Sequence, residues 1–126
     1  MRSRAPGREP VFVISVAARL LEMHPQTLRK YEREGLIAPS RTSGNLRLYS
    51  DEDLERLRQV NHLVRERGLN LAGVQLALEL TMQLRALQAW LADRREGEDG
   101  ATVARLRAEV AGLLAVLGAE DSPLRS

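Results

Sequence analysis

The sequence has no cysteine among its 126 residues. This absence excludes disulfides, thiolate metal sites, iron–sulfur clusters and a cysteine nucleophile. Aromatic residues make up only 3% of the chain, so leucine, valine and alanine must supply most of the core. A long apolar run is also missing, and the arginine-rich residues 1–10 resemble neither a signal peptide nor a membrane anchor, so we expect a cytoplasmic protein.

Patterns that indicate an enzyme are missing as well. The chain shows no glycine-rich phosphate loop and no Ser–His–Asp arrangement, and its carboxylates fall on helical faces without an apolar pocket to activate them. Of the two histidines, His24 is expected to cap a helix and His62 to lie partly exposed on another, which gives no metal-binding spacing. We therefore predict a protein that is not an enzyme and that has neither a metal nor a cofactor.

The charge of the chain is unevenly placed. The net charge is +2, but residues 1–50 carry nine basic and four acidic side chains, whereas residues 51–126 carry ten basic and thirteen acidic ones. A basic front half is typical of a protein that meets a polyanion. Two solvated surfaces that merely differ in charge explain the same numbers, so this feature alone decides nothing.

Two short helices are predicted in the front half. Ser15 can cap a helix over Val16–Glu22, and His24 and Pro25 occupy the cap and first-turn positions of a second helix. Gly35 ends that second helix as a left-handed cap. Two short helices joined by a turn of a few residues are typical of a helix-turn-helix.

A hairpin and a further helix follow. Leu36-Ile37 and residues 46–49 flank a glycine-containing turn and predict two short strands that form a wing. Ser50 then caps a long helix over Asp51–Arg67, and Asn70 caps the next helix. The predicted fold class is mainly α with a small β-hairpin: a winged helix-turn-helix followed by C-terminal dimerisation helices.

Leucine spacing in the back half predicts assembly. Apolar residues at 80, 84, 87 and 91, and again at 103, 106, 110, 113 and 117, follow a two-per-heptad pattern of coiled-coil type. The two patterns are out of register across a turn at Gly97–Gly100, so we expect two helices, near 79–96 and 101–118. We predict a homodimer whose seam contains Leu84, Leu87, Trp90 and Leu91.

These patterns divide the chain into four segments. Residues 1–10 are expected to form a disordered basic arm, and residues 11–80 a winged helix-turn-helix domain. Residues 81–118 form a helical dimerisation and partner segment, broken near 97–100. Residues 119–126 are expected to be a disordered tail.

The second helix carries side chains suited to reading DNA. Its outward-facing residues are predicted to be Gln26, Thr27, Arg29, Lys30 and Arg33. Glutamine and arginine match the edges of adenine and guanine in the major groove. Glu32 and Glu34 on the same helix leave a second interpretation open, in which the helix is a solvated, ion-paired surface.

The hairpin supplies candidates for phosphate contacts. Arg41, Asn45 and Arg47 lie on or beside its turn, and Tyr49 closes it. Arginines along a DNA backbone fix the register of a complex without reading its sequence. The alternative is an ordinary edge hairpin that its charges keep soluble.

The joined motifs resemble the MerR family of transcription regulators. Residues 15–37 are similar to its helix-turn-helix, residues 39–53 to its first wing and the entry to the next helix, and residues 68–74 match as well, so that the resemblance covers about residues 12–80. The resemblance implies groove-facing positions at Gln26, Thr27, Arg29 and Lys30. It implies backbone-facing positions at Tyr31, Arg41, Arg47 and Tyr49, with Arg65 and Arg67 near a second wing.

Within that family, residues 23–29, 41–44 and 70–73 look most like the HspR-type heat-shock repressors. This resemblance implies repression of chaperone genes through an inverted repeat, with the chaperone DnaK as co-repressor. The apolar run Leu113–Leu117 is the segment expected to meet DnaK. Two positions depart from the family pattern, because Glu22 stands where many relatives have glycine and Lys30 where many have tyrosine.

Two other functions stay open. A MerR-like regulator that answers to a different protein, such as a metabolic enzyme, would share every DNA-binding residue. A coiled-coil adaptor, in which the helix-turn-helix only packs, would bind no DNA. Relatives that sense metals or drugs use cysteines or a large effector domain, so no small-molecule effector is expected, and a DNA-binding protein of this kind would be nucleoid-associated.

Overall fold

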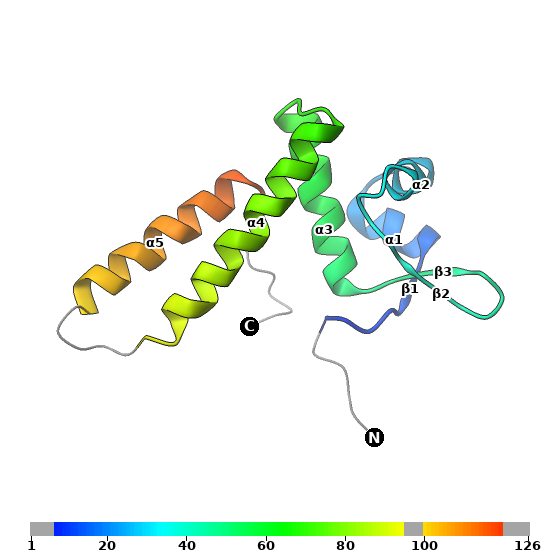
Figure 1. Cartoon of the computed structure of the whole chain (residues 1–126). Coiled ribbons are helices and arrows are strands. Elements are labelled where there is room, and N and C mark those ends of the chain that lie inside the picture. The colour runs from blue at the N-terminus through cyan, green and yellow to red at the C-terminus, as the bar shows by residue number, and fades with distance from the viewer. Residues whose placement is uncertain (1–6, 95–99, 120–126) are drawn as a thin grey trace, which may run out of the picture. The chain divides into compact units, whose positions relative to one another are not determined.

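The computed structural model describes residues 7–94 and 100–119. Its elements run in the order β1 (Phe12–Val13), α1 (Ile14–Leu21), α2 (Pro25–Arg33), β2 (Ser40–Arg41), β3 (Arg47–Tyr49), α3 (Asp51–Asn61), η1 (His62–Glu66), α4 (Leu71–Ala92) and α5 (Gly100–Val116). Helices dominate and the small sheet lies in the first half, which confirms the predicted fold class (Figure 1). Most of the expected basic arm, the turn at 97–99 and the tail after residue 119 lie outside the described residues.

The chain packs as two compact units. One reaches to Asn61 and holds β1 to α3, and the other begins at His62 and holds η1, α4 and α5. The expected boundary between residues 80 and 81 falls inside α4, which runs without a break from Leu71 to Ala92. Asn70 caps this helix as predicted, by accepting a hydrogen bond of 2.9 Å from the backbone three residues further on.

The sheet has three antiparallel strands, and β3 lies between β1 and β2. The prediction of a strand at Leu36-Ile37 is wrong, because β2 begins at Ser40. Leu36 and Ile37 are 2% and 5% exposed and fill the core after α2. A short buried apolar run gives the same sequence pattern in a strand as in a buried loop, so spacing cannot separate the two.

β1 passes directly into α1. Val13 pairs with Leu48 in the sheet and is also the residue before the helix, which begins at Ile14 without a side-chain cap. The predicted cap at Ser15 is therefore wrong, since Ser15 lies exposed in the first turn of the helix. The sheet pairing holds Val13 in an extended conformation, and this sets the start of α1 in place of a capping side chain.

Local signals set both ends of α2. Nδ1 of His24 accepts a hydrogen bond of 3.0 Å from the N–H of Gln26, which confirms the cap, and Pro25 takes the first helical position. Gly35 has a φ of +79° and its N–H donates to the carbonyl of Glu32 at 3.0 Å, which confirms the left-handed end. The length and direction of α2 therefore follow from the residues at its ends.

The turn between α1 and α2 holds Glu22 in a left-handed conformation, with a φ of +55°. A residue with a β-carbon loses roughly 1 kcal/mol there relative to glycine. We expect Glu22→Gly to raise the free energy of unfolding by about 0.5–1 kcal/mol in urea denaturation. Glu34→Gly is the matched control and should lower stability, because Glu34 caps α2 at a φ of −83°. Equal effects of the two changes would contradict strain at Glu22.

Ser50 starts α3 through the predicted reciprocal cap. The N–H of Ser50 donates to Oδ2 of Asp53 at 2.9 Å, and the N–H of Asp53 donates to Oγ of Ser50 at 3.0 Å. The α-helix ends at Asn61 and the π-helical turn η1 follows. The helix predicted over Asp51–Arg67 is thus present, but its hydrogen-bonding pattern changes partway along.

In the second unit, α4 and α5 form an antiparallel hairpin (Figure 1). Its core consists of Leu91, Val110, Leu114 and Ala119, with Leu84 and Val103 packed against them. At the C-terminal end of each helix, an arginine from the other helix donates hydrogen bonds to a backbone carbonyl. Arg107 donates to the carbonyl of Leu91 at 3.2 and 3.3 Å, and Arg85 donates to the carbonyl of Ala119 at 3.1 Å.

The hairpin divides the predicted dimer seam. Leu91 is 1% exposed and Leu84 is half-buried because both pack within the chain, so Leu91 offers no surface to a second copy. Leu87 and Trp90 remain 44% and 53% exposed. A heptad pattern places leucines on neighbouring faces of a helix but does not say which partner covers each face.

Candidate nucleic-acid interface

One face of α2 carries polar side chains that have no partner within the described part of the chain. Leu28 and Tyr31 turn inward, at 0% and 2% exposed, and so decide which face of α2 points outward. The exposed or half-buried residues of that face are Gln26, Thr27, Arg29, Lys30 and Arg33. No side-chain hydrogen bond or ion pair joins any of these five to another described residue. Three cations and an amide are therefore free to meet a ligand.

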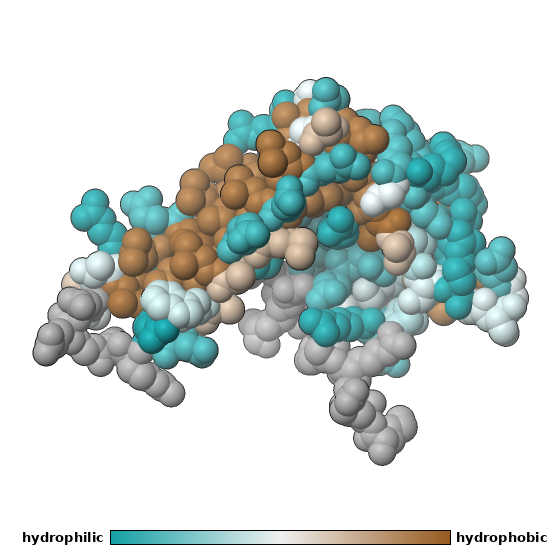
Figure 2. Space-filling model, in the orientation of Figure 1, coloured by the Kyte–Doolittle hydropathy of each residue, from teal (hydrophilic) through white to brown (hydrophobic). Residues whose placement is uncertain are grey.

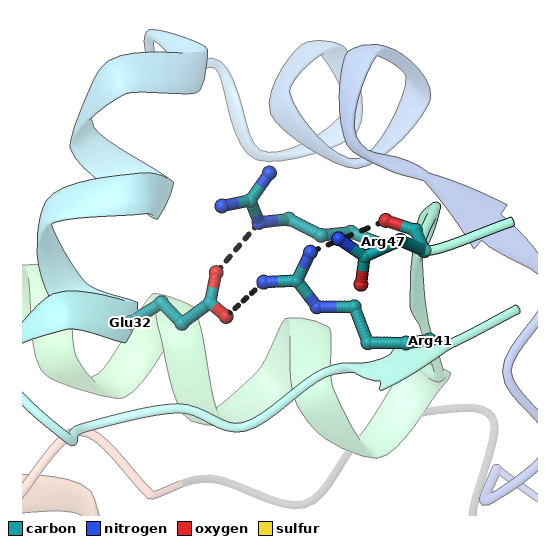
Figure 3. A network of polar contacts seen from close by, with 4 residues as sticks. Glu32, Arg41 and Arg47 are labelled. Atoms are coloured by element: carbon teal, nitrogen blue, oxygen red, sulfur yellow. Dashed lines mark hydrogen bonds and ion pairs between the residues drawn. The ribbon is translucent and has the colours of Figure 1, made fainter.

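The wing arginines meet α2 at one carboxylate. Arg41 on β2 and Arg47 on β3 lie opposite each other in the sheet register. One oxygen of Glu32 accepts a hydrogen bond of 2.6 Å from Nη2 of Arg41, and the other accepts one of 2.6 Å from Nε of Arg47 (Figure 3). Arg41 also donates to the carbonyl of Asn45 at the wing turn, at 3.3 Å. The fold thus brings three predicted wing residues together with one residue of the helix.

The pairing fixes the charges of this cluster. Burial by itself would raise the pKa of Glu32, but hydrogen bonds from Arg47 and Arg41, together with their positive charges, hold that pKa below its ordinary value. The hydrogen bond to Glu32 raises the pKa of Arg47. At neutral pH the carboxylate is ionised and both guanidinium groups are charged, so the three side chains carry one net positive charge.

Arg47 keeps donor capacity for a ligand. Its Nε bonds to Glu32, while within residues 7–94 and 100–119 its two terminal amino groups have no hydrogen-bond partner. Its side chain is 26% exposed. Two parallel N–H donors match a phosphate or carboxylate, so the outer edge of this guanidinium is a ready anion contact.

Two residues expected to contact DNA lie in the core instead. Tyr31 is 2% exposed, with its hydroxyl donating to Oδ1 of Asn61 at 3.4 Å, and Tyr49 is fully buried. Burial raises the pKa of Tyr49, and its hydroxyl has no hydrogen-bond partner among the residues described. In a chain with 3% aromatics, these rings are among the largest apolar groups that the core can take. The expectation that they face a DNA backbone is corrected accordingly.

Acid is expected to release the wing from α2. A carboxylate whose pKa is lowered by folding contributes stability that is present above its ordinary pKa of 4.5 and is lost as the pH falls through the folded value. The free energy of unfolding of the wild-type protein should therefore exceed that of the Glu32→Gln variant at pH 7. The difference between the two should shrink as the pH falls below 4.5. Urea titrations of both proteins across this range measure it. A difference that does not change with pH would contradict an ionised Glu32.

Sequence reasoning missed the role of Glu32. The sequence favours an ion pair along the surface of the helix for this residue, whereas its partners come from the wing, 9 and 15 residues further along the chain. Only the folding of the wing against α2 brings them together. An acidic residue on an otherwise basic helix, followed by two arginines on a short hairpin, is the one signal in the sequence.

Three further observations come from the rest of the described chain. Arg65 and Arg67 are exposed next to Gly68, in the unit that begins at His62. No group of three or more histidines or carboxylates in the described part of the chain could hold a metal ion. None of the described helices combines the length and apolarity needed to cross a membrane.

Comparison with known proteins identifies the family. The model of the MerR HTH family regulatory protein matches residues 12–81, more than half of the chain. The chain belongs to the MerR HTH family. The matched region contains the helix-turn-helix, the wing, α3 and the first half of α4. Members of this family bind DNA, typically as dimers, so the chain is a DNA-binding transcription regulator and not an enzyme.

Individual relatives agree with this assignment. A Streptomyces coelicolor protein that carries the name heat shock protein HspR is 50% identical over 102 residues, which are 81% of this chain and 68% of that protein. The transcriptional regulator GlnR of Bacillus anthracis is 36% identical over 69 residues, 55% of this chain and 53% of GlnR. The regulator MlrA of Escherichia coli is 33% identical over 69 residues, 54% of this chain and 28% of MlrA. The chain thus spans about two thirds of the HspR relative and about half of GlnR.

Proposed function

We propose that this MerR-family regulator represses heat-shock genes by binding an inverted-repeat operator as a homodimer. The observation that carries the DNA part is the outward face of α2, whose three cations and one amide have no partner in the described chain. The heat-shock part rests on the identity of 50% to a relative that carries a heat-shock name. The wing supports the proposal through Arg47, which holds a charged guanidinium edge free.

In this proposal α2 reads bases and the wing contacts phosphates. The residues assigned to base edges are Gln26, Thr27, Arg29 and Lys30. The residues assigned to the DNA backbone are Arg33, Arg41, Asn45 and Arg47. A two-pronged contact from arginine or glutamine discriminates between bases by about 1–3 kcal/mol, whereas phosphate contacts add affinity for any duplex.

The α4–α5 hairpin supports dimerisation. Figure 2 shows apolar side chains gathered in a band along these two helices. The exposed apolar residues on one side of α4 are Leu76, Leu80, Leu87 and Trp90, and those on α5 are Leu106, Leu113 and Val116, each at least 44% exposed. A contiguous apolar surface of this extent is rare on a monomer, and a second copy would cover it. We propose this band, in place of Leu84 and Leu91, as the main part of the seam.

We further propose DnaK as the co-repressor, on the resemblance to HspR-type repressors. The run Leu113–Leu117 is only partly available: Leu114 is 2% exposed, whereas Leu113 and Val116 are 52% and 54% exposed. Nε2 of His62 lies 3.3 Å from the carbonyl of Val116 and ties this turn to η1. A chaperone that takes extended apolar segments would have to open this turn, and it strengthens repression only if it binds the DNA-competent state better than the alternative.

The test is a genome-wide map of the DNA that the protein occupies before and after heat shock. Occupied chaperone promoters that are vacated on heating, with DnaK co-purifying before the shock, would support the whole proposal. Occupied promoters of another gene class, with a metabolic enzyme co-purifying, would favour a regulator with a different partner. No occupied sites at all would favour the coiled-coil adaptor.

A further inference from the structure

Glu32 occupies an unusual position for an acidic residue in a DNA-binding face. It lies on α2, three residues after Arg29 and next to Arg33, so it belongs to the same helix as the base-reading candidates. Its side chain is 21% exposed, and each of its two oxygens accepts a hydrogen bond of 2.6 Å from a different strand of the wing. One carboxylate therefore connects the reading helix to both phosphate-contacting strands.

The wing itself explains why a negative charge is needed there. Arg41 and Arg47 are direct cross-strand partners, and like charges placed opposite each other on two strands are destabilising. Figure 3 shows the two guanidinium groups on the same side of the wing, each turned toward the carboxylate of Glu32. Without that carboxylate the two cations would repel each other and separate. With it, each guanidinium is held at a fixed donor atom.

The arrangement also limits how the wing meets a polyanion. Glu32 occupies Nη2 of Arg41 and Nε of Arg47, while Asn45 takes a further donor of Arg41. Each guanidinium has five N–H donors, so three remain on Arg41 and four remain on Arg47, the latter all on its two terminal amino groups. Because Glu32 belongs to α2 and pairs with both arginines, the remaining donors keep a fixed position relative to that helix.

We infer that Glu32 is a specificity-determining, positioning residue: it makes the phosphate contacts of the wing depend on the seating of α2 and so weakens binding to non-operator DNA. This inference rests on the proposed function. Its consequence is opposite to that of a purely structural residue, because removing the charge should strengthen binding to unrelated duplexes. Loss of a residue that only stabilised the fold would weaken binding to every duplex.

The experiment compares Glu32→Gln with Glu34→Gln in the full-length chain. Glu34 lies on the same helix end, and within the described residues its carboxylate has no arginine partner, so the control removes the same charge without releasing the wing. The probes are a duplex that the wild-type protein has enriched from a random pool and a scrambled duplex of the same composition. Binding to each is measured from 50 to 200 mM salt.

For Glu32→Gln, we expect affinity for the scrambled duplex to rise roughly threefold to tenfold and its salt dependence to steepen by about one unit of slope, as one more phosphate contact requires. Affinity for the enriched duplex should stay nearly constant, so the preference for it should fall by the same roughly threefold to tenfold. Glu34→Gln should change both affinities by the same factor. A Glu32→Gln protein that keeps the wild-type preference would overturn the inference.

Two further outcomes keep the test decisive. If Glu32→Gln does not melt cooperatively, Glu32→Asp is measured instead. Its charge is kept but its side chain is too short for both arginines, so its preference should fall about threefold, and an unchanged preference would overturn the inference. If the wild-type protein itself enriches no duplex, the proposed function is wrong, and the inference about Glu32 is wrong as well because it rests on that function.

Discussion

Arg29→Ala is expected to abolish the preference for the operator, whereas Arg47→Ala should remove one phosphate contact, weaken binding and leave a clear preference for the operator. Arg29 lies half-buried on the outward face of α2 without a partner in the described chain, so its guanidinium is available for a two-pronged base contact. Removing that contact should cost about 1–3 kcal/mol of discrimination in each half-site. Arg47 offers a free edge from the wing, and its loss should reduce the slope of log affinity against log salt by about one unit per protomer.

Titration of labelled operator and scrambled duplexes at several salt concentrations measures both effects. Arg58→Ala is the control, because Arg58 is an exposed cation on α3, outside α2 and the wing. It should alter both affinities slightly and equally. If Arg47→Ala changed the preference between duplexes while Arg29→Ala did not, the assignment of helix to bases and wing to phosphates would be reversed.

The combined change Leu80→Glu and Leu87→Glu is expected to convert the dimer into a folded monomer. Both residues lie in the exposed apolar band of α4, at 48% and 44% exposed, so the charges are tolerated in a monomer but not beneath a second copy. Operator affinity should fall by at least about a hundredfold, since each half-site must then be bound separately. Sedimentation velocity and duplex titration measure the two effects.

Two control variants separate dissociation from unfolding. Met82→Glu changes a residue that is 69% exposed on another side of α4, and it should leave the dimer intact. Leu91→Glu places a charge in the core of the hairpin, where 1% of the residue is exposed, and it should lower the melting temperature of the chain. A double variant that stays dimeric at micromolar concentration would exclude this band as the seam.

Most of the fold could be predicted from the sequence because short-range contacts determine where its helices begin and end. The cap at His24, the left-handed stop at Gly35 and the reciprocal cap of Ser50 and Asp53 all depend on residues within three positions of one another. Such contacts form in the same way whatever the rest of the chain does. The outward residues of α2 follow similarly, because Leu28 and Tyr31 set the buried face.

Features that depend on distant partners could not be predicted in this way. The burial of Tyr49 and the pairing of Glu32 with Arg41 and Arg47 both arise from packing between segments that are separated along the chain. The heptad spacing of Leu84 and Leu91 indicates an apolar stripe on α4. In the structure α5 of the same chain covers this stripe. Sequence spacing describes one surface at a time, whereas these outcomes depend on which two surfaces meet.

The most direct test of dimeric, sequence-specific DNA binding is selection from a pool of random duplexes by the full-length protein. We predict that it enriches one inverted repeat, with half-site centres one or two turns of DNA apart, because a two-fold dimer presents its two α2 helices symmetrically. Enrichment of a single unrepeated site would contradict the dimer, and enrichment of no sequence at all would contradict base reading by α2.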